Sequence, residues 1–165
     1  MLGALFVCAK FFYKYANVAQ LLWLVKPVAI WISSVTNTEM YWVDSLGYIF
    51  PKLGICIEKS CSGYNMLLIS YSMLSYLILL NKLNSSNFLV WIIAFLLSYF
   101  LSIFSNFTRI YFSLVFSRKL PHLWIPSHEI IHQGIGVFTN LLFLIFTYLF
   151  IQYLFKIKQA NEKSS

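Results

Sequence analysis

Residues 128–132 spell HEIIH, which matches the histidine–glutamate pattern of zinc proteases. On a helix, His128 and His132 lie one turn apart, so both can bind a zinc ion while Glu129 activates the bound water. The third ligand is the difficulty of this interpretation, because the only acid downstream is Glu162 in the tail. It would have to come from Asp44, Glu58, Cys61 or His122. The alternative without chemistry is that water and lipid headgroups solvate both histidines.

Residues 59–65, KSCSGYN, contain a different candidate, the thiol of Cys61. At the start of a helix, the positive end of the helix dipole favours the reactive thiolate. Gly63 would let backbone N–H groups approach a substrate carbonyl, as an oxyanion site requires. The alternatives are a buried structural thiol or a bridge to Cys56. With Cys8, the chain has three cysteines, too few for a disulfide framework.

Arg109 is the third candidate, in the stretch SNFTRIYF. It lies between long apolar stretches, where an ionisable side chain is unfavourable and indicates a functional site. The alternative is that its head reaches the lipid headgroups. Cys61, Arg109 and His132 together would supply a thiolate nucleophile, a positive charge for the oxyanion and a group that moves protons.

The composition predicts that these residues belong to an integral membrane protein. Of 165 residues, 60% are hydrophobic and only 10% are charged, whereas a soluble domain of this size needs far more polar surface. We expect a single all-α domain over residues 1–165, a polytopic helical bundle of about four to five spans. The net charge of +7 comes from basic residues scattered at segment ends. They predict membrane anchors rather than a nucleic-acid partner.

Three uncharged stretches are long enough, or nearly so, to cross a bilayer: residues 64–80, 88–108 and 133–155. Cys61 precedes the first, Arg109 follows the second and His132 opens the third. Because successive crossings alternate in direction, the three candidate residues are predicted to share one membrane face. Three lysines in the C-terminal tail favour a cytoplasmic C-terminus, so the site is predicted to face the extracytoplasmic side.

Two segments precede these spans. Residues 1–35 are apolar but interrupted by lysines and Pro27, and they fit either one tilted helix with a surface piece or two short helices. Residues 36–62 are more polar and contain Gly47, Pro51 and Gly54. We expect them to form a polar extracytoplasmic loop, with a short strand-like alternation near its end.

KSCSGYN, then NFTRI, then H-x-x-x-G at residues 132–136, occur in this order at the ends of such spans. This arrangement resembles the exosortase/archaeosortase family, and the Ser-Cys-Ser-Gly-x-Asn stretch and short length resemble its compact branch, exosortase K. The resemblance covers roughly residues 10–150. Many family members have Glu-Ala before the cysteine and Leu-Arg after the glycine. Here Glu58 stands three residues before Cys61, and Asn65 stands at the arginine position.

The resemblance implies a membrane cysteine transpeptidase that cleaves C-terminal sorting signals of secreted proteins and passes them to a lipid or glycoconjugate acceptor in the cell envelope. It implies that Cys61 is the nucleophile, Arg109 stabilises the transition state and His132 is the acid/base. The substrate-binding or supporting residues are then Ser62, Gly63, Asn65, Asn106 and His128. The HEIIH pattern becomes a chance overlap, and we expect no metal and no cofactor. The remaining alternatives are an intramembrane zinc protease and a non-catalytic membrane scaffold.

Overall fold

The computed structural model describes the backbone of residues 2–81, 88–119 and 128–164. Within these ranges, the side chains of residues 2, 4, 5, 117–119, 128–133 and 158–164 are not described. The described residues form five α-helices: α1 (Leu2–Tyr15), α2 (Leu22–Thr36), α3 (Tyr64–Leu80), α4 (Phe88–Lys119) and α5 (His128–Ser164). They also form two short 3-10 helices, η1 (Val18–Leu21) and η2 (Lys59–Cys61), and three strands: β1 (Tyr41–Val43), β2 (Gly47–Phe50) and β3 (Ile55–Ile57).

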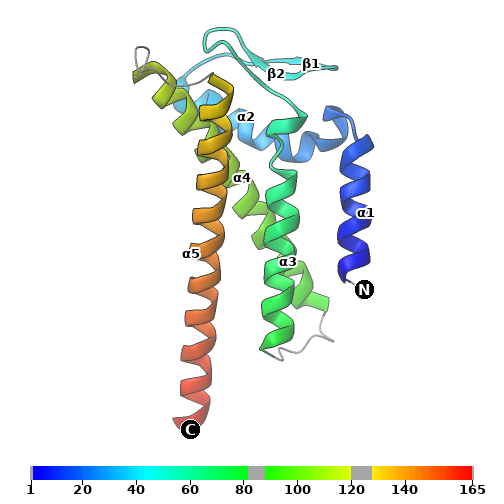
Figure 1. The fold of residues 1–165 in the computed structure, drawn as a ribbon, viewed down its shortest axis with the longest axis vertical. Coiled ribbons are helices and arrows are strands. Elements are labelled where there is room, and N and C mark those ends of the chain that lie inside the picture. The colour runs from blue at the N-terminus through cyan, green and yellow to red at the C-terminus, as the bar shows by residue number, and fades with distance from the viewer. Residues whose placement is uncertain (1, 82–87, 120–127, 165) are drawn as a thin grey trace.

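The architecture is a helical bundle whose long helices α3, α4 and α5 carry a small sheet at one end (Figure 1). The start of α3, the end of α4 and the start of α5 all lie at this sheet end. By length and composition, the described part of the chain has four segments that could cross a membrane: Val18–Thr36, Lys59–Leu80, Phe88–Phe116 and Gly134–Ile157. The predicted all-α membrane bundle is therefore confirmed.

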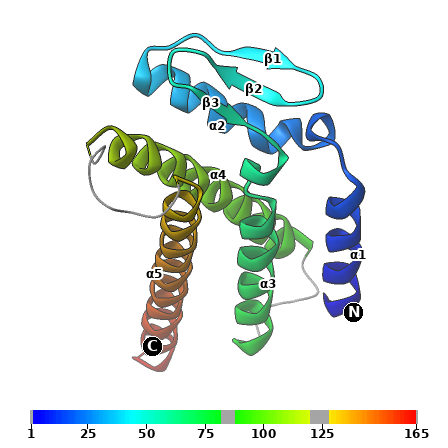
Figure 2. The same ribbon diagram turned by 45° about the horizontal axis from the view of Figure 1, so that its top comes forward.

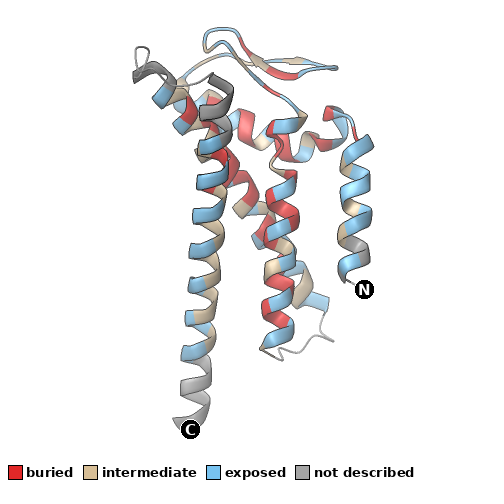
Figure 3. Cartoon of the chain, in the orientation of Figure 1, coloured by how far each residue is buried: buried red, intermediate tan, exposed pale blue. Residues whose placement is uncertain are grey.

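Serine side chains line the seam where α4 packs against its neighbours. Ser98, Ser102 and Ser105 are fully buried on α4. Small residues let helices approach closely in a bilayer, where apolar burial does not drive helices together. The outer surfaces are apolar instead: Phe138 and Phe146 of α5 are exposed, and most described turns of α5 beyond its start are coloured as exposed or intermediate in Figure 3. This pattern suits a bundle whose outer face contacts lipid.

The N-terminal segment forms two helices, which decides between the alternatives that the sequence left open. Figures 1 and 2 show α1 standing beside α3, whereas α2 lies crosswise to α3 and α5. Pro27 lies inside α2 and has no N–H to donate to the Trp23 carbonyl four residues earlier. The hydroxyl of Tyr99 on α4 donates to that carbonyl instead, at 2.8 Å. This hydrogen bond fastens α2 across α4.

The connection at residues 36–62 is not an open loop, because it folds into an antiparallel sheet in the order β1-β2-β3. Tyr48 of β2 lies between Trp42 of β1 and Ile57 of β3. Phe50 and Ile57 are almost completely buried and belong to the same apolar cluster as the buried face of α2. Burial of these side chains on α2 anchors the sheet over the end of the bundle, where α3 begins (Figure 2).

Candidate active site

Cys61 lies in a tight turn between β3 and α3. It is the last residue of η2, where its N–H donates to the Glu58 carbonyl at 3.0 Å. We expected the thiol at the start of the long helix, but α3 begins only at Tyr64, after the break at Gly63. The residue is 9% exposed, and its sulfur lies 3.7 Å from the hydroxyl oxygen of Ser60. The thiol is therefore almost enclosed by protein.

Gly63 is required here by both its backbone and its surroundings. Its φ of 73° lies in the left-handed region, which residues with a side chain seldom adopt. A Cβ at this position would lie 2.9 Å from the Ser102 hydroxyl oxygen and 3.2 Å from the Asn106 Cβ. Glycine thus lets the turn that carries Cys61 press directly onto α4.

Two side chains of α4 hold this turn by its carbonyl groups. The Asn106 amide nitrogen donates to the Cys61 carbonyl, and the Ser102 hydroxyl donates to the Gly63 carbonyl at 2.7 Å. Asn106 is 2% exposed, yet its amide oxygen has no hydrogen-bond partner among the described residues. A buried acceptor without a partner is unfavourable, so the hydrogen bonding of the Asn106 side chain is incomplete within the described residues.

Arg109 stands one helical turn beyond Asn106 on the same side of α4, since the two positions are three residues apart. Its side chain packs against α5, because a Cβ added at Gly136 would lie 2.7 Å from the Arg109 Cδ. The Arg109 Nε is buried and finds no hydrogen-bond partner within the described residues. The guanidinium is thus held in the seam between helices with a donor left unused.

The position of His132 follows from the register of α5. Gly136 contacts Arg109, and the Asn140 amide oxygen accepts a hydrogen bond of 2.8 Å from Ser105 of α4. Residues spaced by four lie on the same side of a helix, so the His132 backbone occupies the next position on this α4-facing side, one turn nearer the sheet.

The HEIIH stretch occupies the first turns of α5, which begins at His128. The side chains of His128, Glu129 and His132 lie outside the described residues. Within the described part of the chain, there is no group of three or more His, Cys, Asp or Glu residues that could hold a metal ion.

Tyr13 of α1 is a site residue that the sequence did not indicate. Its hydroxyl donates to the Lys59 carbonyl at 3.2 Å, and its ring stacks on Tyr64 with a centroid distance of 5.0 Å. The pKa of this hydroxyl is raised, mainly by burial. A hydrogen bond with Ser62 acts against this shift, the charge of Cys61 adds to it, and the charge of Arg109 opposes it. Tyr13 therefore contacts both ends of the turn that carries Cys61, at Lys59 and Tyr64.

Ser62 and Asn65 flank the break in different ways. Ser62 is 1% exposed and accepts a hydrogen bond from the Tyr64 N–H at 3.3 Å, so it shapes the turn. Asn65 is exposed and accepts a hydrogen bond of 2.6 Å from the Lys10 ammonium group of α1. Its side chain is therefore engaged with α1 rather than with the turn that holds Cys61.

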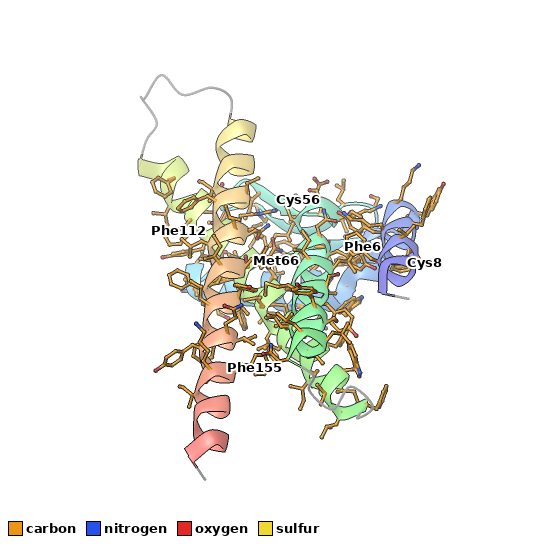
Figure 4. The ribbon with its side chains drawn as sticks, turned by 60° about the horizontal axis from the view of Figure 1, so that its bottom comes forward. Phe6, Cys8, Cys56, Met66, Phe112 and Phe155 are labelled. Atoms are coloured by element: carbon orange, nitrogen blue, oxygen red, sulfur yellow. The ribbon has the colours of Figure 1, made fainter. Side chains whose placement is uncertain are left out.

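The other two cysteines differ from Cys61 in that both are exposed. Cys8 is exposed on α1, and Cys56 is exposed on β3 (Figure 4). All three thiols are free, so the bridge between Cys56 and Cys61 is not formed. Burial, followed by the charges of Glu58 and Cys61, raises the pKa of the Cys56 thiol. Cys56 is consequently less reactive as a thiolate at neutral pH.

Comparison with known proteins adds no relative. No protein-family model, curated protein or solved structure matches this chain.

Gly136→Ala should reduce activity by displacing Arg109. The new methyl group would lie 2.7 Å from the Arg109 Cδ, so the flexible arginine must shift. Since small misplacements of catalytic groups cost about a hundredfold in rate, we expect a loss of roughly ten- to a hundredfold with an intact bundle. The matched control is Gly134→Ala, where no atom of the described residues lies within 4 Å of the new methyl. Equal activities of the two variants, measured as substrate processing in membranes, would contradict a role for Arg109.

Proposed function

We propose that the protein is a membrane cysteine transpeptidase that cleaves C-terminal sorting signals of exported proteins. One observation carries this proposal. Asn106 of α4 donates to the Cys61 carbonyl and so holds the turn that carries the nearly buried thiol, and one helical turn further on, the Arg109 Nε has no hydrogen-bond partner among the described residues. A merely structural cysteine needs neither feature. The order of the three motifs along the chain, and its resemblance to the exosortase/archaeosortase family, add independent support.

In the first step, the Cys61 thiolate attacks the substrate carbonyl and forms a tetrahedral oxyanion. The Arg109 guanidinium stabilises this negative charge, which grows only as the sulfur–carbon bond forms. His132 gives its proton to the leaving amine as the carbon–nitrogen bond breaks. The products are a thioester on Cys61 and the free C-terminal peptide.

In the second step, an acceptor attacks the thioester. His132, now neutral, takes the proton of the incoming hydroxyl or amine, and Cys61 leaves again as the thiolate. The acceptor of this proposal is a lipid or glycoconjugate of the cell envelope. The substrate is a secreted protein whose signal includes a membrane helix that approaches the bundle from the side.

The thioester gives the most direct test. Membranes from a host that makes the substrate are treated with hydroxylamine, which cleaves thioesters. We expect the processed protein to be released with a C-terminal hydroxamate, and the peptide that contains Cys61 to carry an acyl group when quenched in acid without hydroxylamine. If processing proceeds while neither species is detected by mass spectrometry, the covalent mechanism is refuted.

We further propose that the site faces the extracytoplasmic side of the cell membrane. In a cysteine-free background, cysteines placed at Asn84 and Ser164 should react with a membrane-impermeant maleimide only from the cytoplasmic side. A cysteine at Ser117 should react only from outside, because one crossing separates it from residue 84. Labelling of positions 84 and 117 from the same side would contradict this topology.

A further inference from the structure

The crosswise helix α2 and Tyr99 of α4 line an open groove of about 650 Å³. Three aromatic side chains line it, Trp23 and Trp31 of α2 and Tyr99 of α4, together with apolar Ile30. Trp23 stacks on Tyr99 with a centroid distance of 5.6 Å. The single charged group among the described lining residues is Lys26.

Lys26 is an unpaired cation in apolar surroundings. It is exposed, and it makes no hydrogen bond or ion pair with any described residue. In the sequence it is the only charged residue between Lys14 and Glu39. A cation in such a segment of a membrane protein requires an anionic or polar partner. The Lys26 ammonium group is therefore free to bind an anionic group from outside the described part of the protein.

The orientation of α2 indicates what that partner is. The helix lies across the bundle beneath the sheet rather than along α3 and α5 (Figure 1). A crosswise apolar helix at the end of a membrane bundle lies near the lipid headgroups, where Trp and Tyr rings and basic residues are typical. At this depth, the abundant anionic groups are the phosphates of phospholipids.

We propose that this groove binds an anionic phospholipid, with the lipid phosphate on Lys26 and an acyl chain against Trp23, Ile30 and Tyr99. This site is separate from the thiol centre and does not depend on the proposed transpeptidase activity.

The hydrogen bonding of the groove favours a lipid over a peptide segment. Pro27 leaves the Trp23 carbonyl free within α2, but Tyr99 already donates to it. An extended peptide would need hydrogen-bond partners for its backbone N–H and C=O groups, and this carbonyl is not available. An acyl chain needs none, and its contact with the aromatic rings is favourable.

Quenching of tryptophan fluorescence by brominated lipids tests the proposal on the full chain. The protein is reconstituted in phosphatidylcholine vesicles that contain a fixed minor fraction of either brominated phosphatidylglycerol or brominated phosphatidylcholine. Because bromine quenches on contact, a lipid in the groove reports on Trp23 and Trp31. One basic residue near an anionic lipid gives a preference of about fivefold, which we expect for phosphatidylglycerol in the wild type.

Lys26→Gln should abolish this preference, and Lys26→Arg should retain it. The matched control is Lys52→Gln, which removes the same charge from an exposed turn between β2 and β3 and should keep the preference. The proposal is overturned by equal quenching from both lipids in the wild type, by a preference that survives in Lys26→Gln, or by an equal loss in Lys52→Gln. Displacement by inorganic phosphate at constant ionic strength would also overturn it, because a free anion would then be the ligand.

Discussion

Cys61→Ala is expected to abolish processing of the cognate exported protein, with a loss on the order of a thousandfold or more. The reason is that the sulfur forms the covalent bond to the substrate, and no described neighbour can replace it. The Ser60 hydroxyl lies 3.7 Å from the sulfur, but its proton is donated to the Glu58 carboxylate at 2.8 Å. Accumulation of the unprocessed substrate in membranes, followed by immunoblotting, measures the effect.

Cys8→Ala and Cys56→Ala are the matched controls, because both remove an exposed thiol and should leave most activity. Cys61→Ser should also be poor, since an alcohol remains protonated where the site requires an anion. A thermal melt of each purified variant separates loss of chemistry from loss of fold. Full processing by a well-folded Cys61→Ala protein would exclude the cysteine mechanism.

The sequence predicted the bundle because its signals are strong and physically simple. Long uncharged stretches have few stable states other than membrane helices. Because successive crossings alternate in direction, the sequence also predicted that Cys61 and Arg109 lie at the same end of the bundle. Of the small sheet, the sequence indicated only the strand-like alternation near β3, for the opposite reason. Its strands are three or four residues long, and its apolar alternation is interrupted by Gly47, Gly54 and Pro51. Such short strands are stabilised by packing on α2 rather than by local pattern.

The supporting residues of the site were only partly predictable. Asn106 was predicted as a supporting residue only because it belongs to the NFTRI stretch that resembles the family. Its hydrogen bond to the Cys61 carbonyl depends on how α3 and α4 pack. Tyr13 gave no signal, since an aromatic residue in an apolar N-terminal segment is ordinarily a membrane anchor. Its contact with Lys59 arises between residues far apart in the sequence. Contacts of this kind follow from tertiary structure and have no local pattern.

His132→Ala is expected to be inactive, whereas His128→Ala and Glu129→Gln should keep substantial activity. A zinc protease and the proposed cysteine enzyme predict different results for these three variants. A zinc site of the HExxH type uses both histidines as ligands and the glutamate as base, so loss of any one is nearly total. The proposed cysteine site needs only His132, whose backbone lies on the α4-facing side of α5, one turn before Gly136. Processing in membranes and metal content of the purified protein are the measurements.

Two further readouts sharpen this comparison. Phenanthroline should have little effect on processing, while a small thiol alkylator that reaches Cys61 should inhibit it. Glu129 is the second residue of α5. A negative charge at this position stabilises the helix start by about 0.3–1 kcal/mol. Glu129→Gln can therefore lower activity a few fold, because it destabilises the helix that carries His132. The metalloprotease alternative predicts a bound metal ion in addition to the loss of activity. Stoichiometric zinc, together with near-total loss in both His128→Ala and Glu129→Gln, would establish the metal site and exclude the cysteine enzyme, because no role of these two residues in orienting His132 requires a bound metal.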